Sequence, residues 1–263
     1  MEAICTDLIA EHDALDALVT DLVSEAWDTP TPAPRWSVRD QISHLWFFDR
    51  TATLAATDAA AFEAHKVELL GAVAAPGVEP DTAAGRAITP AELLVNWRRD
   101  REVLVSALRP LDPKSRLPWY GPAMAAPSFA TARLMETWAH GQDVADAIGV
   151  QREPTARLRH VAHIGVRARP FAYLVNEMSM PASEIHVALL APDASVWTWG
   201  DEASPHRVEG HALEFCLVAT QRRHLDDTSL RITDGDALEW MRIAQTFAGG
   251  PGAGREPGQF SED

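Results

Sequence analysis

The stretch Phe129–Gly149, FATARLMETWAHGQDVADAIG, is the part of the chain from which a fold is most directly predicted. Its apolar residues recur at helical spacing, no proline interrupts it, and Gly149 is a suitable helix stop. Glu136 and His140 are four residues apart, so a helix places both side chains on one face. Such a pair can supply two ligands to a divalent metal ion, but it is also common on solvated helix faces. A third ligand from elsewhere in the chain is needed to favour the metal.

Three more long helices are predicted before this stretch. Apolar residues at helical spacing predict the first over Ile4–Ala26. The second begins after the N-cap residue Ser37 and continues for about thirty residues, with a break near Thr57. The third covers Pro90–Leu108 and begins with a Thr-Pro-Ala-Glu capping sequence. Four long helices joined by loops predict an N-terminal four-helix bundle.

Other segments of this half are predicted to be irregular or exposed. Gly71–Gly85 is rich in glycine, alanine, proline and acidic residues, and we expect a loop there. In the aromatic segment Leu117–Pro122, Trp119 and Tyr120 either cover the mouth of a pocket or form a packed turn. The helix over residues 90–108 also has a charged side that we expect to be solvated, made of Arg98, Arg99, Asp100, Arg101 and Glu102.

After Val150 the composition changes, and the predicted elements become mixed. A β-hairpin is predicted from two β-rich runs separated by a Pro-Asp-Ala-Ser turn. The full set is a helix over Pro154–Tyr173, strands over Glu184–Leu190 and Val196–Trp199, a short strand or turn followed by a helix over Arg207–Thr220, a strand over Leu230–Thr233, and Ala237–Phe247 as helical or extended. The predicted fold class is therefore α plus α+β: a four-helix bundle over residues 1–153, a small α+β domain over 154–248 and a disordered tail over 249–263.

The composition excludes several classes of function. A formal net charge of -15 argues against a nucleic-acid backbone or an anionic membrane surface as partner. Cys5 and Cys216 lack metal-type spacing, so we expect buried thiols in a reducing compartment. The N-terminus is acidic and amphipathic, unlike a signal peptide, and no apolar run has membrane-spanning length. We therefore expect a soluble cytoplasmic protein.

His44, in the second predicted helix, changes the interpretation of Glu136 and His140. Alone, a histidine set among aromatic residues is most simply a core or boundary residue. In a bundle, however, His44 can converge with the pair on the fourth helix at one interior point. Two histidines and one carboxylate leave coordination positions open, as catalytic zinc or iron sites do.

The chain resembles the DinB-like superfamily and, within it, the mycothiol-dependent maleylpyruvate isomerase family. The resemblance is carried by WSVRDQISHL at residues 36–45 and METWAHGQDVADAIG at residues 135–149. It implies a metal-binding bundle, with Zn2+ or another divalent ion held by His44, Glu136 and His140, followed by a domain similar to sterol carrier proteins. VEGHALEFCLVATQRR, ending at residue 223, resembles the family's glycine, helix and arginine pattern and implies that Arg222 or Arg223 reaches the active site. A doubled arginine stands there in place of the usual glycine–arginine.

Three hypotheses about function follow. The first is a thiol-dependent isomerase or transferase that uses mycothiol as co-substrate, because no cysteine lies near the three ligands in sequence. A metal-bound thiolate would add to a small electrophilic substrate, and Arg222 or Arg223 would bind a substrate carboxylate. The second is a metal-dependent hydrolase with Asp143 as general base or as hydrogen-bond partner of a ligand. The third is a non-catalytic protein that binds a metal or a small ligand. A homodimer stays an open alternative.

Overall fold

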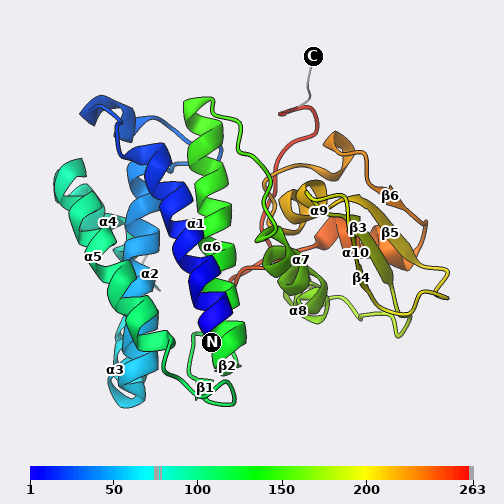
Figure 1. Ribbon diagram of the computed structural model, residues 1–263, viewed down its shortest axis with the longest axis horizontal. Coiled ribbons are helices and arrows are strands. Elements are labelled where there is room, and N and C mark those ends of the chain that lie inside the picture. Colours follow the sequence, from blue (N-terminus) through cyan, green and yellow to red (C-terminus); the bar gives the residue numbers. More distant parts are fainter. Residues whose placement is uncertain (74–76, 78, 261–263) are drawn as a thin grey trace. The chain divides into compact units, whose positions relative to one another are not determined.

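The computed structural model describes residues 1–73, 77 and 79–260 of the 263-residue chain. The described residues form two compact units, divided between Arg152 and Glu153, the first helical and the second mixed (Figure 1). The predicted fold class, α followed by α+β, is confirmed.

Four long helices form the first unit: α1 (Glu2–Val19), α2 (Val38–Thr57), α5 (Pro90–Leu108) and α6 (Ala126–Ile148). α2 contacts α5 and α6, and α1 contacts the same two helices, so the four close into a bundle (Figure 1). Between α5 and α6, the two-residue strands β1 (Arg116–Leu117) and β2 (Met124–Ala125) pair antiparallel. Much of the buried core comes from one apolar cluster made of Leu15, Val19, Trp27, Val38, Ile42, Leu45, Trp46, Leu93, Leu94, Trp97 and Val144.

The ends of these helices follow local capping chemistry. A capping box begins α2, where the Ser37 hydroxyl accepts from the backbone N–H of Asp40 and the Asp40 carboxylate accepts from that of Ser37. Thr89 and Glu92 begin α5 in the same way. α6 ends at Gly149, whose φ of 68° is left-handed, as the sequence predicts. The first helix is shorter than predicted: it ends at Val19, and residues 24–28 form the separate 3-10 helix η1.

Two shorter helices lie between α2 and α5. α3 (Ala59–Val73) begins two residues after Thr57, where a break is predicted. α4 (Pro80–Arg86) contradicts the prediction of a loop over Gly71–Gly85, although residues 74–76 and 78 of that stretch lie outside the described residues. The reason is tertiary: α4 packs on α2, and its backbone hydrogen-bonds to a buried α2 side chain.

The charged side of α5 is only partly solvated. Arg101 is 9% exposed and donates to the His12 carbonyl oxygen at 2.8 Å. Its guanidinium also pairs with Asp16 at 2.8 Å and lies 4.5 Å from the centre of the Trp97 ring. The prediction of a solvated face is therefore wrong for Arg101, because α1 brings acidic and carbonyl oxygens against it.

A four-stranded sheet of order β4-β3-β5-β6 organises the second unit. β3 and β4 form the predicted antiparallel hairpin, β3 pairs parallel with β5, and β6 pairs antiparallel with β5. α9 contacts β3 and β5, α7 packs on α9, and α8 packs on α10. The elements are α7 (Leu158–Arg167), α8 (Arg169–Val175), β3 (His186–Leu190), β4 (Val196–Trp199), β5 (Arg207–His211), α9 (Ala212–Ala219), η2 (Leu225–Asp227), β6 (Arg231–Ile232) and α10 (Asp236–Ile243).

Two predictions for this half need comment. The single helix predicted over Pro154–Tyr173 is instead α7 and α8, which are separated at Ala168. Part of the tail makes contacts, since the Gly258 N–H donates to Asp227 Oδ1 at 2.7 Å, while residues 261–263 lie outside the described residues. No helix in the described ranges combines the length and apolar composition that a membrane span requires.

Candidate metal centre

The structure brings together the three side chains that the sequence proposes as ligands. His44, Glu136 and His140 each offer a ligand atom, and these atoms all lie within 4.8 Å of one another. His140 Nε2 is 3.2 Å from Glu136 Oε2, and the ring centres of His44 and His140 are 4.4 Å apart. α2 supplies His44 and α6 supplies the other two, so packing of these two helices creates the cluster.

Both histidine rings are held through Nδ1 by a second side chain. His44 Nδ1 lies 2.8 Å from Asp81 Oδ2, and His140 Nδ1 lies 2.5 Å from Gln41 Oε1. Gln41 Nε2 donates to Thr31 Oγ1 at 2.9 Å, which leaves the amide oxygen to accept from His140. These acceptors favour the tautomer with the proton on Nδ1 and leave Nε2 as the nitrogen for a metal. The residues therefore fit a divalent ion with histidine and carboxylate ligands.

Glu136 is in the charge state that a ligand needs. In the metal-free protein burial raises the pKa of Glu136, but a hydrogen bond from the protonated His140 ring and the charges of protonated His140, of Arg133 and of protonated His44 outweigh burial and lower the pKa to about 2. The carboxylate is therefore ionised at neutral pH. The buried positive charge of Arg133 is itself compensated, because its guanidinium pairs with the carboxylate of the buried Asp49 at 3.0 Å.

Aromatic side chains surround the two imidazoles. Trp36 stacks on His140 with ring centres 5.8 Å apart, and its ring centre is 5.0 Å from that of His44. Phe48, one turn after His44 on α2, lies 4.6 Å from the same ring. The proline-rich turn before α2 positions Trp36, because Thr31 donates through its hydroxyl to the Trp36 carbonyl oxygen at 2.9 Å.

The aromatic segment before α6 extends this environment. Trp119 stacks on Phe62 of α3 with ring centres 5.7 Å apart, and its carbonyl oxygen accepts from Lys66 Nζ at 2.9 Å. Phe48 contacts both Trp119 and Tyr120, at 6.2 and 5.8 Å between ring centres. Of the two alternatives drawn from the sequence, these contacts favour a packed turn. Phe48 lies between this turn and the His44 ring and contacts both.

The other residues predicted for the site are not among these three candidate ligands. Asp143 lies on α6 and is fully buried. Arg222 and Arg223 belong to the second unit, where Arg222 Nη1 donates to the Thr220 carbonyl oxygen at 2.6 Å and Arg223 Nη1 to that of Arg222 at 2.7 Å. Their roles stay predictions.

Sequence reasoning missed three residues that support the cluster. Trp36 and Gln41 lie inside the same WSVRDQISHL motif as His44, and that shared motif is the sequence signal that could identify them. Asp81 gave no local signal, because it comes from a segment predicted to be a loop and contacts a histidine 37 residues earlier.

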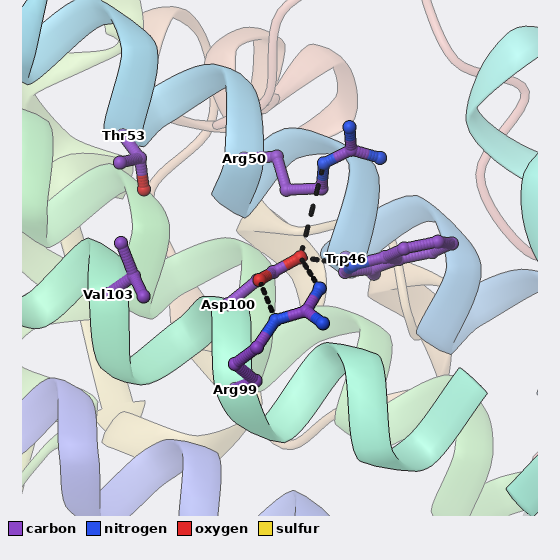
Figure 2. A pocket seen from close by; sticks show the side chains of 6 residues that line it. All are labelled: Trp46, Arg50, Thr53, Arg99, Asp100 and Val103. Atoms are coloured by element: carbon purple, nitrogen blue, oxygen red, sulfur yellow. Dashed lines mark hydrogen bonds and ion pairs between the residues drawn. The ribbon is translucent and has the colours of Figure 1, made fainter. Parts of the chain in front are cut away.

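A surface hollow between α2 and α5 is a second feature of the bundle (Figure 2). Asp100 lies at its centre, accepts from Trp46 Nε1 at 2.7 Å and Arg99 Nε at 2.7 Å, and has Arg50 Nε at 3.9 Å (Figure 2). The hollow is therefore an ion-paired surface with no histidine, and none of the three candidate ligands is among its described lining residues, Trp46, Arg50, Thr53, Arg99, Asp100 and Val103.

The fold and the cluster define a class of protein: a helical bundle with interior histidine, glutamate and histidine side chains, followed by a mixed α+β unit. Residues 8–145 match the family described as mycothiol maleylpyruvate isomerase N-terminal domain, and this match contains all three side chains. The chain belongs to this family, as its motifs predict.

The chain is also similar to two relatives in sequence and to two solved structures in fold. Proteins from two strains of Mycobacterium tuberculosis, each named as an uncharacterized protein, are 48% identical over 252 residues, 95% of this chain and 96% of theirs. The fold is similar to crystal structures of the mycothiol-dependent maleylpyruvate isomerase and of a histidine-to-alanine mutant of it, at 14% and 13% identity and a TM-score of 0.56. Each of these matches covers 84% of this chain and 89% of the solved one, and at such identity it shows the fold alone.

Proposed function

We propose that this protein is a divalent-metal enzyme that uses a low-molecular-weight thiol of the mycothiol type to isomerise or transfer a small electrophilic substrate. The observation that carries the proposal is the convergence of His44, Glu136 and His140 within 4.8 Å, in a chain of the mycothiol maleylpyruvate isomerase N-terminal domain family. Two histidines and one carboxylate are the ligand set of several catalytic zinc sites, which keep a position open for a reactant.

The three side chains would hold the ion, and their neighbours fix their geometry. Zn2+ bound there would lower the pKa of a thiol that coordinates it and keep that thiol as a nucleophilic thiolate. Glu136 contributes a carboxylate that is ionised at neutral pH. Asp81 and Gln41 hold the Nδ1 atoms of His44 and His140, and Trp36 stacks against His140 and excludes water from that face of the ring.

The burial of the chain's own cysteines favours a reaction in which the thiol comes from outside the protein. Its two cysteines, Cys5 and Cys216, are both fully buried. Burial raises the pKa of each thiol, which disfavours the nucleophilic thiolate. A thiol-dependent reaction in this protein therefore needs a second small molecule that brings the sulfur.

We further propose that Arg222 or Arg223 binds a carboxylate of the substrate, since a guanidinium can bind a carboxylate through two parallel hydrogen bonds. Replacing the functional arginine by alanine is expected to raise KM for an anionic substrate, and lysine at the same position to restore part of the affinity. Changes to the other arginine should leave KM unaltered, so the pair of variants identifies which one acts.

The test combines metal content with turnover. Purified protein is expected to contain one equivalent of a divalent metal by elemental analysis, and His44→Ala is expected to lose it. Metal-loaded protein is then incubated with mycothiol and maleylpyruvate or other electrophiles, and thiol consumption and products are measured. Metal binding without turnover across this panel would leave only a binding protein, and turnover that needs no thiol would indicate hydrolysis instead.

A further inference from the structure

One turn of α2 holds the short helix α4 in place. The Ser43 hydroxyl donates to the Asp81 carbonyl oxygen at 2.6 Å and accepts from the Gly85 N–H at 3.0 Å, so one buried side chain contacts both ends of α4. Arg86, the last residue of α4, donates through Nε to Asp40 Oδ1 at 2.7 Å. Asp40, Ser43 and His44 lie within five consecutive residues, so the α2 turn that carries a candidate ligand also fixes α4.

The close approach of α4 to α2 requires glycine at position 85. A Cβ atom added to Gly85 would lie 2.4 Å from the Cβ and 2.5 Å from the Oγ of Ser43. Both residues are fully buried or nearly so, and Ser43 is held by its hydrogen bonds, so the contact cannot be relieved by a simple side-chain rotation. Any larger residue at 85 must therefore push α4 away from α2.

The result of this packing is the position of one carboxylate. Asp81, in the first turn of α4, places Oδ2 2.8 Å from His44 Nδ1. Both side chains are largely buried, at 20% and 17% exposed, so the hydrogen bond is sheltered from competing water. Displacing α4 would break this contact without touching any of the three candidate ligands.

We infer that Asp81 is a positioning residue for the metal centre and that α4, held by Ser43 and Gly85, is the element that sets its position. The inference rests on the proposed function, because it concerns affinity for the proposed metal. Carboxylate partners of metal-bound histidines fix the ring orientation and raise the basicity of the ligand nitrogen, and removing them costs about 10-fold to 100-fold in metal affinity.

The experiment measures zinc affinity of the full-length protein by competition with a chromophoric chelator. Asp81→Ala is expected to weaken binding about 10-fold to 100-fold, and Asp81→Asn, whose amide oxygen still accepts a hydrogen bond, to fall between it and the wild type. Gly85→Ala keeps every polar group and is expected to weaken binding about 10-fold through displacement of α4. The absorption spectrum of the cobalt-substituted protein should change in the same order, whereas a loss of stability with no change around the metal would leave that spectrum unaltered.

Two matched controls are available in the same unit. Glu2→Gln removes an exposed carboxylate that pairs with Arg109 and belongs neither to α4 nor to the candidate ligands, and Gly71→Ala adds a Cβ to open space on α3. Both should bind zinc as the wild type does. If the wild-type protein binds no zinc, the metal centre and this inference are both overturned. If the wild type binds zinc and Asp81→Asn, Asp81→Ala and Gly85→Ala bind it with the same affinity, the inference alone is overturned. Urea midpoints of the metal-free variants identify any that fail to fold.

Discussion

At the scale of single residues, the interior of the bundle contains titratable groups that do not belong to the metal centre. His12 on α1 is 2% exposed and lies edge-on to Trp97, with ring centres 6.2 Å apart. Its Nε2 is 4.0 Å from Oδ2 of the buried Asp49. Burial, followed by the positive charges of Arg101 and Arg133, holds the pKa of His12 well below its ordinary value of 6.5. His12 is therefore neutral in the folded protein at neutral pH.

This burial predicts how stability depends on pH. Below pH 6.5 the unfolded chain protonates His12 and the folded protein does not, so the unfolded state binds more protons and stability falls as the pH falls. The full slope for one group is about 1.4 kcal/mol per pH unit. Urea unfolding at neutral pH and about one unit below 6.5 measures it, and His12→Gln should lose this part of the dependence. An unchanged dependence in that variant would contradict the assignment.

How far the site could be predicted differs from residue to residue. His44, Glu136 and His140 can be identified from the sequence, because two of them lie at helical spacing and all three lie in the two motifs that resemble the family. Asp81 cannot be identified from the sequence, because its hydrogen bond to His44 Nδ1 leaves no periodic trace there. The burial of Arg101 cannot be predicted from its own helix either. A charged residue on a helix is buried only where a neighbouring helix supplies its partners, as α1 does here.

At the scale of secondary-structure elements, the helices and strands whose ends are determined by nearby residues match the prediction. α5 spans Pro90–Leu108 as expected, because Thr89 and Glu92 cap it and proline occupies its first position. β4 likewise covers Val196–Trp199. α4 could not be predicted, since its composition is that of a loop and its helical form depends on hydrogen bonds from Ser43, 38 residues before Asp81.

The end of α6 provides a test of one such local signal. Gly149 adopts a left-handed φ of 68° and a Cβ there would meet no atom within 4 Å, so replacement by alanine costs only backbone strain. We expect Gly149→Ala to lower the free energy of unfolding by about 1 kcal/mol. Gly71→Ala, at a helical and open position in α3, should instead raise it by about 0.5 kcal/mol. Urea unfolding of both variants checks the opposite signs, and a shift in the same direction for both would refute the argument.

At the scale of the whole molecule, buried ion pairs join the helices of the bundle. Arg133 on α6 pairs with Asp49 on α2, Arg101 on α5 pairs with Asp16 on α1, and Arg152, the last residue of the first unit, pairs with Glu11 on α1. Removing one member of such a pair leaves an uncompensated buried charge, so these pairs oppose a slip of one helix against another. That registry keeps α2 and α6 in the alignment that brings the three candidate ligands together.

Metal binding should therefore be visible in the stability of the whole protein. A ligand that binds only the folded state stabilises it according to its concentration, and zinc at a hundred times its dissociation constant adds about 2.7 kcal/mol. All three candidate ligands lie in Met1–Arg152, so the unfolding of this unit is the one expected to shift. Scanning calorimetry with added zinc and with a chelator measures the shift in wild-type protein and in His44→Ala.

His206→Ala, which removes a histidine of the second unit, is the matched control and should respond to zinc as the wild type does. Chelation should return the wild type to the transition temperature of the metal-free protein, and His44→Ala should be insensitive to both treatments. Nonspecific zinc binding to a chain of net charge -15 would affect all three proteins equally, so only specific binding separates His44→Ala from the other two. An equal rise in His44→Ala would show that the zinc effect comes from the acidic surface and not from the convergence of α2 and α6.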